Sequence, residues 1–320
     1  MADHADDDGD GDSFVYRGGR APQHITHAHV DESLAEIEDK AFSGCQNLLQ
    51  VDTHDGIRKI GKTAFYRCES LPRINLKSVV EIERFACYGC VNLESIEFGG
   101  RLETIGDRAF SYCPLQHLKL PSVITIVKFA FFGCKRLTAV ELSERLETIG
   151  AGAFCRCERL QRIAIPLKRD LFVYDDEDGY DQFHGCEQLA TVDVVGGIHK
   201  TIASLHMENW RAEMLAEINR INQVLPRTPW GKTDEIRQWM TSVMDKMDHY
   251  KTEHCRYVKE GITLLELALW NAKLCEKEDS PAERQTKKAK VDGASARKEG
   301  RVTSGADVVI KNVLPFLQLE

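Results

Sequence analysis

The chain has 320 residues, of which 42% are hydrophobic and 29% charged, and its formal net charge is −8. This composition excludes a wholly disordered protein, and the length leaves room for two packed units. Net negative charge argues against nucleic acid as a partner, because phosphate binding requires a clustered excess of Lys and Arg. With an acidic start and no window of about 18 apolar residues, the sequence predicts an intracellular protein of the cytoplasm that does not enter a membrane.

An acidic segment, residues 1–13, opens the chain and has no apolar period, which predicts disorder. A short apolar run at 14–16 and an atypical coil with Ala28 and Val30 in alternation follow, and we expect them to cap the repeats. In that coil His27 and His29 point outward, with His24 nearby, and we expect solvent-exposed histidines there rather than a metal site.

A repeat dominates the centre of the chain, over residues 14–200. Seven cysteines recur at steps of 23, 22, 23, 21, 23 and 29 residues: Cys45, Cys68, Cys90, Cys113, Cys134, Cys157 and Cys186. In each copy an Ile-x-Leu step has the period of a half-buried strand, and the stretch Gly-x-x-Ala-Phe-x-x-Cys turns the chain. Because one copy cannot bury its apolar row alone, the spacing predicts stacked coils with a continuous core.

The cysteines have a structural explanation in this repeat. Cys87 occupies the Phe position of its copy, so the apparent pair Cys87-x-x-Cys90 does not indicate zinc, and no second pair lies at metal-ligand spacing. In a reducing compartment we expect free thiols, and the repeat predicts a buried ladder that includes Cys68, Cys113, Cys134 and Cys157. We expect neither a metal nor a cofactor.

The frame resembles the BspA-like leucine-rich-repeat family, whose coils read I-G-x-x-A-F-x-x-C-x-x-L-x-x-I-x-L-P, over roughly residues 25–195. The resemblance implies a scaffold used for recognition rather than catalysis, and it carries over no catalytic residues. The stretch from Val195 to Leu205 and the helices after it are similar to a C-terminal extension of other leucine-rich-repeat proteins.

An acidic insertion, residues 168–181, lengthens the last step of the repeat. A calcium loop with Gly179 in sixth place would put Tyr174 first and Gly185 twelfth, so both key ligands are missing. We expect a solvated surface loop, with contact to a basic partner as the alternative.

A helical hairpin module is predicted over residues 201–277. The first helix ends at Pro226 and Pro229, Asp234 caps the second, and a heptad-like seam runs from Ile236 to Cys275. The short helix cannot cover the long one, so a helical bundle is favoured over an isolated coiled coil.

The remaining cover could come from a C-terminal helix at 304–320 or from a second copy of the chain. Between the hairpin and this helix, residues 278–303 form a predicted disordered linker. Its run Lys287–Lys290 resembles a nuclear-localisation signal, which makes the nucleus the alternative compartment.

The predicted fold class is therefore α+β, a leucine-rich-repeat β-solenoid followed by a helical hairpin or bundle. The sequence holds no GxGxxG, P-loop, GxSxG or HExxH motif, so we do not expect an enzyme or a small-molecule substrate. The expected function is a protein-binding scaffold or adaptor, whose partner the sequence does not identify. The alternative is a structural homo-oligomer assembled through the C-terminal helices.

Strand alternation predicts where a partner protein binds. It gives an outward row of Asp52, Asn75, Glu97, Lys119, Glu141, Ala164 and Asp193, and a neighbouring row of Gln50, Arg73, Ser95, His117, Ala139, Arg162 and Thr191. The candidate binding residues are Asp52, Asn75, Glu97, Lys119, Glu141, Asp193, Arg73, His117 and Arg162. Four carboxylates in the first row favour a basic segment of another protein, and solubility is the alternative explanation.

Overall fold

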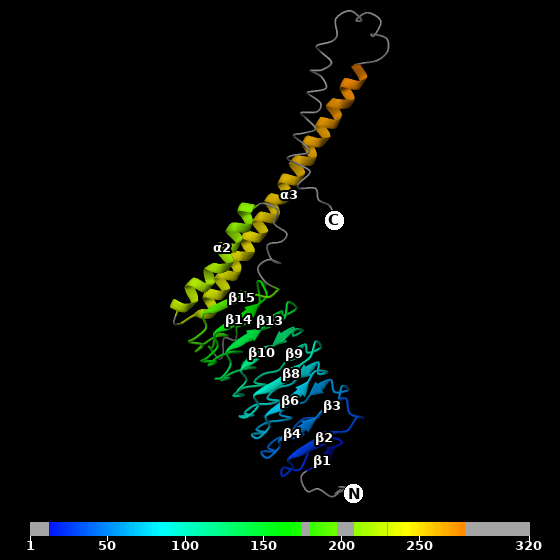
Figure 1. The fold of residues 1–320 in the computed structure, drawn as a ribbon, viewed down its shortest axis with the longest axis vertical. Coiled ribbons are helices and arrows are strands. Elements are labelled where there is room, and N and C mark those ends of the chain that lie inside the picture. Colours follow the sequence, from blue (N-terminus) through cyan, green and yellow to red (C-terminus); the bar gives the residue numbers. More distant parts are fainter. Residues whose placement is uncertain (1–12, 175–178, 197–207, 229, 279–320) are drawn as a thin grey trace, which may run out of the picture. The chain divides into compact units, whose positions relative to one another are not determined.

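The computed structural model describes residues 13–174, 179–196, 208–228 and 230–278 (Figure 1). The chain divides into two compact units: Met1–Ser204 with Glu213–Met244, and Leu205–Ala212 with Asp245–Glu320. One boundary falls after Ser204, near the predicted end of the solenoid at residue 200, and two others cross the helices, after Ala212 and after Met244. The reason is that the last coil of the solenoid packs against the adjoining parts of both helices.

One side of each coil is a strand of three or four residues, and together these strands form what we call the strand face. They pair in parallel in three groups, β1-β2-β4, β6-β8 and β10-β12-β14-β15. Their bounds are β1 (Ser13–Tyr16), β2 (His27–Val30), β4 (Gln50–Asp52), β6 (Arg73–Leu76), β8 (Ser95–Phe98), β10 (His117–Lys119), β12 (Ala139–Glu141), β14 (Arg162–Ile165) and β15 (Thr191–Val194). The predicted alternation of buried and exposed residues holds along them, as in Arg73–Leu76.

A second side of each coil carries a strand of only two residues. These strands form a continuous parallel sheet in the order β13-β11-β9-β7-β5-β3. Their bounds are β3 (Glu36–Ile37), β5 (Lys59–Ile60), β7 (Glu81–Ile82), β9 (Thr104–Ile105), β11 (Thr125–Ile126) and β13 (Thr148–Ile149). Each ends in a buried Ile, so the second sheet closes the core opposite the strand face.

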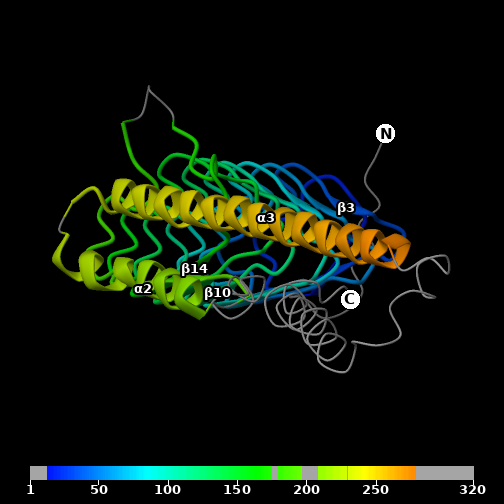
Figure 2. The same ribbon diagram turned by 90° about the horizontal axis from the view of Figure 1, so that it is seen from above.

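The third side, which we call the turn face, is formed by the Ala-Phe-x-x-Cys segments. Backbone hydrogen bonds join each coil to the next there: the Phe42 N–H donates to Ala64 at 2.7 Å, and the Phe110 N–H donates to Ala130 at 2.8 Å. Successive coils nest along the solenoid (Figures 1 and 2). This ladder satisfies polar backbone groups that would otherwise be buried without partners.

Large residues and glycines alternate from coil to coil on the turn face. Two residues after the Phe position, the backbone is left-handed in every coil, with Gly44, Arg67, Gly89, Tyr112, Gly133, Arg156 and Gly185 in succession. A Cβ on Gly133 would lie 2.9 Å from the Tyr112 ring, and one on Gly89 would lie 3.3 Å from the Arg67 stem. Each large side chain therefore covers the glycine of the next coil.

Phenylalanine rings fill the core beneath the turn face. Phe131 stacks on Phe110 and Phe154 with ring centroids 5.6 and 5.4 Å away. Cys87 interrupts this stack, as its place in the repeat predicts, and Phe98 from β8 packs edge-on against Phe110 at 5.7 Å. The larger side chain on the strand thus compensates for the smaller one in the turn.

The cysteine ladder is confirmed, and it has a polar role that the repeat does not predict. All seven repeat cysteines are buried and free. The Cys68 thiol donates to the Phe42 carbonyl at 3.1 Å, and the Cys157 thiol donates to the Phe131 carbonyl at 3.2 Å. Every repeat cysteine after Cys45 makes the same bond to the Phe position of the preceding coil.

The helices are α2 (Glu208–Val224), a 3₁₀ turn (Leu225–Arg227) and α3 (Lys232–Glu278). Because α3 begins at Lys232, Asp234 lies in its first turn and not before it, where a capping residue would be. α2 runs beside the first part of α3 (Figure 2). Ile218, Ile221, Trp239 and Val243 are buried between them, as an antiparallel hairpin requires.

The hairpin closes the C-terminal end of the solenoid. The Lys232 ammonium donates to the carbonyls of Glu187 and Leu189 at 3.0 and 2.5 Å. Asn222 Oδ1 accepts from the Val192 N–H of β15 at 2.8 Å, and Thr233 accepts from the last coil. The last strand is an edge whose polar groups need partners, and the helices supply them.

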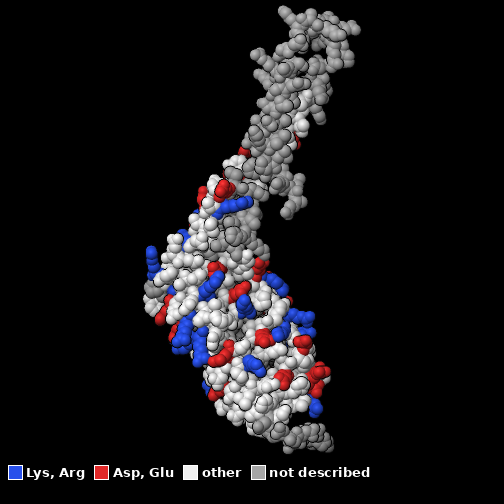
Figure 3. All heavy atoms as spheres, viewed as in Figure 1, with Lys and Arg blue, Asp and Glu red and all other residues white. Residues whose placement is uncertain are grey.

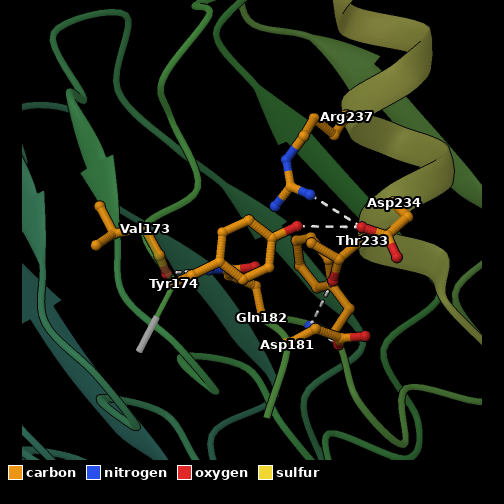
Figure 4. Close-up of polar contacts among 8 residues, drawn as sticks. Val173, Tyr174, Asp181, Gln182, Thr233, Asp234 and Arg237 are labelled. Carbon is orange, nitrogen blue, oxygen red and sulfur yellow. Dashed lines mark hydrogen bonds and ion pairs between the residues drawn. The ribbon is translucent and has the colours of Figure 1, made fainter. Parts of the chain in front are cut away.

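A polar cluster beside this contact joins the acidic insertion to α3 (Figure 4). The Tyr174 hydroxyl donates to Asp234 Oδ1 at 3.1 Å, and Arg237 donates to the same oxygen at 2.9 Å. The guanidinium carbon of Arg237 lies 4.1 Å from the centre of the Tyr174 ring. This end of the insertion is therefore anchored, while residues 175–178 lie outside the described residues.

In the second unit, Trp210 of α2 stacks on Tyr250 of α3 with centroids 5.1 Å apart. Farther along α3 most apolar side chains are exposed. The predicted disordered segments at 1–13 and 278–303 and the helix at 304–320 lie outside the described residues, except that Ser13 begins β1 and Glu278 ends α3. Neither described helix is apolar over a length sufficient to cross a membrane.

Candidate functional site

The strand face places the two predicted rows as strand alternation requires. Asn75 lies opposite Glu97, and Lys119 lies opposite Glu141. In the neighbouring row Arg73 pairs with Ser95, and the small residue Ala139 lies between His117 and Arg162. The expected register is confirmed for every one of these strand pairs.

All nine candidate residues line two hollows on the strand face. The larger hollow, of about 670 Å³, is lined by His117, Lys119, Glu141, Arg162 and Asp193 together with Ala139 and Ala164. The smaller hollow, of about 260 Å³, is lined by Asp52, Arg73, Asn75 and Glu97 together with Gln50 and Ser95. The larger hollow lies where short side chains stand, because alanines leave space between the longer flanking residues.

Most carboxylates of the first row have a basic partner on the same face. Glu97 is 2.6 Å from Lys77, and Glu141 is 3.6 Å from Lys119. The hydrogen bond from Lys77 lowers the pKa of Glu97. Figure 3 shows acidic and basic side chains interspersed over the visible face of the solenoid. The row is therefore not a bare acidic strip.

The ends of the first row differ in their charge pairing. Asp193 is held by Arg162 at 2.5 Å. Asp52 accepts a hydrogen bond from the Gln50 amide at 2.8 Å, and it forms no ion pair with the described Lys and Arg side chains. Asp52 is thus the carboxylate of the row that a basic ligand would meet without displacing a Lys or Arg partner.

Two residues of this face are not among the nine candidates. Lys77 follows β6, two positions after Asn75, so the same alternation would have placed it on the outward side. His29 lies opposite Asp52 in the strand pairing, and the alignment of the first coil already placed it outward. The row therefore extends by one coil toward the N-terminus.

The described residues contain no group of three or more His, Cys, Asp or Glu side chains that could hold a metal ion. What the strand face offers is a row of exposed hydrogen-bonding groups and exchangeable ion pairs beside shallow hollows. Such a surface can hold an extended polypeptide through side-chain contacts spaced by one coil, about 4.8 Å.

Comparison with known proteins gives a family and several solved structures. The model of the BspA type leucine-rich-repeat region matches residues 21–128 and 105–211, with six copies. The T. pallidum leucine-rich-repeat protein TpLRR is 27% identical over 57% of this chain and 74% of its own, with a TM-score of 0.38. A Bacteroides ovatus leucine-rich-repeat protein is 19% identical over 55% and 60%, with a TM-score of 0.31.

The pneumococcal vaccine antigen PcpA is 16% identical over 58% of this chain and 72% of its own, with a TM-score of 0.34. No curated protein matches the chain. The family match spans more than half of the sequence and coincides with the coils whose Phe and Cys ladders are described above. The chain belongs to the BspA-type leucine-rich-repeat family.

Proposed function

We propose that the chain is a non-enzymatic scaffold that binds another protein through the strand face. The observation that carries the proposal is that all nine candidate residues line the two hollows of this face. The repeat family supports the general role, because its stacked coils present a broad exposed sheet for recognition.

The proposed ligand is a basic segment of the partner protein. Such a segment would meet Asp52 directly and would replace Lys77 and Lys119 as partners of Glu97 and Glu141. The exchange costs little, because exposed ion pairs are worth about 0 to 1 kcal/mol each, and the side chains of Lys119 and Glu141 are 82% and 61% exposed. The hollow beside Ala139 and Ala164 has space for an apolar side chain of the same segment.

The test is a Glu97→Lys, Glu141→Lys variant, with unchanged melting as its first requirement. The matched control is Glu36→Lys, Glu81→Lys, which makes the same change of charge on exposed carboxylates of the second sheet. Partners captured by the parent chain at moderate salt should be lost by the first variant and kept by the control. If both variants recover every partner, the strand face is not the interface.

A second candidate function, homo-oligomerisation through α3, rests on a separate observation. Leu264, Leu267, Leu269 and Trp270 are 58%, 49%, 56% and 63% exposed. Leu264, Leu267 and Trp270 follow one another at steps of three residues and so share one side of the helix, an apolar stripe of the kind that packs against another element, whereas Leu269 lies on another side. A second copy of the chain could supply the cover.

The solution mass distinguishes this candidate from a monomeric adaptor. The chain is 36.2 kDa, and an oligomer assembled through α3 would run at a multiple of that mass at micromolar concentration. Leu264→Glu with Leu267→Glu should return such an oligomer to the monomer, whereas the Glu97→Lys, Glu141→Lys variant should leave it intact. A monomeric parent chain would exclude this function.

A further inference from the structure

The turn face carries a band of arginines and aromatic rings that the proposed function does not use. We call the arginine band the set Arg67, Arg84, Arg108 and Arg156 with the rings Tyr66, Tyr88, Tyr112, Phe85, Phe129 and Phe132. These residues lie within or just before the Phe-x-x-Cys motif, or its Cys87-x-x-Cys90 equivalent, in five consecutive coils, so coil stacking brings them together.

The rings of the band contact one another along the solenoid. Tyr66 stacks on Tyr88 with centroids 5.3 Å apart, and Tyr88 meets Tyr112 edge-on at 5.5 Å. Tyr112 in turn meets Phe132 at 5.4 Å. A hollow of about 240 Å³ lies among Tyr88, Arg108, Ser111, Tyr112, Phe129, Phe132 and Tyr180. Its size suits a single side chain of a ligand.

The arginines lie against these rings. The guanidinium of Arg108 is 4.4 Å from the centre of Phe129, and that of Arg84 is 4.8 Å from Phe85. Arg67 and Arg156 lie 5.7 and 5.6 Å from Tyr66 and Phe132. Ring contact restricts these side chains, so less conformational entropy is lost when a ligand binds them.

The band has an excess of positive charge, in contrast to the paired charges of the strand face. Arg84 and Arg108 share one carboxylate, Asp107, at 2.9 Å each. Arg67 and Arg156 are exposed and form no ion pair with any described Asp or Glu side chain. Among the described residues, Asp107 is thus the one carboxylate that is ion-paired with any of the four guanidinium groups of the band, in a chain whose formal net charge is −8.

The geometry favours an acidic polypeptide over a nucleic acid. Base stacking needs free ring faces, but the rings of the band contact one another and the guanidinium groups, and among them only Tyr112 is largely exposed, at 44%. Carboxylates need only the outer N–H groups of the guanidinium, which stay available. Arg67 and Arg156 are four coils apart, about 20 Å, which an extended segment of about six residues spans.

We propose that the arginine band is a second docking surface, which binds an acidic segment of a partner protein in extended form. Carboxylates of the segment pair with Arg67 and Arg156 at its two ends and with Arg108 near its centre, beside the hollow. This surface is separate from the strand face and takes a ligand of opposite charge.

The probe is a fluorescein-labelled peptide of 12 residues in which Asp and Ser alternate, titrated with the full chain at low salt. The Arg67→Gln, Arg156→Gln variant keeps the side-chain stems over Gly89 and Gly185 and should weaken binding about tenfold. The matched control, Arg101→Gln with Arg145→Gln, makes the same change of net charge at the corner before the second sheet and should bind like the parent. A peptide of Asn and Ser should not bind.

Three outcomes would overturn the proposal: no binding of the Asp-Ser peptide to the parent, equal weakening by both double variants, or tighter binding of a 12-nucleotide single-stranded DNA through the same arginines.

The chain's own residues 1–12 contain six Asp and would compete with the peptide. Removing residues 2–12 should therefore leave the affinity unchanged or raise it, and weaker binding would contradict the proposal. The Glu97→Lys, Glu141→Lys variant, which changes only the strand face, should bind the Asp-Ser peptide like the parent.

Discussion

At the scale of single residues, the cysteine of each coil combines two properties that few side chains share. The thiol is small and apolar enough for the core, and it still donates a weak hydrogen bond, here to a carbonyl of the preceding coil. The repeat predicts the burial of these cysteines. The donor role was not predictable from sequence, because it depends on which carbonyl the neighbouring coil presents.

The buried thiols should make the chain sensitive to alkaline pH. Burial raises the pKa of Cys155 to about 12 and raises the pKa values of Cys113, Cys157 and Cys186 well above the ordinary 9.0. The folded chain therefore keeps these groups as thiols, whereas the unfolded chain ionises them once the pH exceeds 9.0. The contribution of the thiols to the free energy of unfolding is complete below pH 9.0 and is lost progressively above it. The free energy of unfolding, measured by urea titration, should fall by about 1.4 kcal/mol per pH unit for each such thiol.

Thiol labelling at pH 8 gives the companion measurement. Cys255 is exposed and should react at once, whereas the nine buried cysteines should react only at the rate of unfolding. A Cys255→Ser, Cys275→Ser background isolates the ladder. Rapid labelling of the ladder cysteines in native buffer would show that they are not buried.

The pair Cys87 and Phe98 should behave as one unit in mutagenesis. Cys87→Phe alone would overpack the core against Phe98 and lower the free energy of unfolding by about 1 to 3 kcal/mol. Adding Phe98→Leu restores the residue type of the equivalent Leu76 and Leu120 and should recover most of that loss. A double-mutant cycle by chemical denaturation measures the coupling, and additive effects would show that the two side chains do not share space.

At the scale of elements, the helical hairpin is the end cap of the solenoid, a role that its sequence pattern alone does not reveal. The seam predicts helices and their pairing, and Pro226 predicts the break between them. It does not predict that Lys232 and Asn222 hydrogen-bond the last coil, because those contacts join residues about 30 to 45 positions apart.

Lys232→Met should destabilise the last coil selectively. The substitution keeps the apolar stem but leaves the carbonyls of Glu187 and Leu189 without this donor, at a cost of about 1 to 3 kcal/mol. Hydrogen exchange should show the loss first in β15 and only weakly in the strands near the N-terminus. The control Lys251→Met removes an exposed ammonium from α3, 61% exposed, and equal effects of the two variants would contradict the capping role.

The sequence predicts the strands of the strand face better than the two-residue strands of the second sheet. It also predicts the positions of the candidate residues better than their ion pairs. The Ile-x-Leu strands and their outward rows followed from a period of 2, but a strand of two residues such as Thr104–Ile105 has no period to detect. The candidate residues Glu97 and Asp193 were placed on the correct face. Their pairing with Lys77 and Arg162 depends on side-chain conformation across coils, which alternation does not encode.

At the scale of the whole molecule, the stacked coils give one chain two surfaces of different chemistry. The strand face pairs most of its carboxylates with basic side chains, whereas only two of the four arginines of the turn face form an ion pair with a described carboxylate. A repeat makes this separation possible because each position of the frame recurs on the same side of every coil. The two proposed surfaces together predict a scaffold that holds a basic and an acidic segment at once.

The alternation of large residues and glycines on the turn face also limits how such a solenoid can change length. Removing one coil, residues 113–133, would place Tyr112 directly against Arg156, two large residues where the stack needs one large and one small. Removing two coils, residues 113–156, would place Tyr112 against Gly185 and keep the alternation. Thermal unfolding should therefore show the longer deletion to be the more stable chain, the reverse of the order that lost core area predicts. The number of coils could then change only in steps of two, and duplications that preserve the fold would add coils in even numbers.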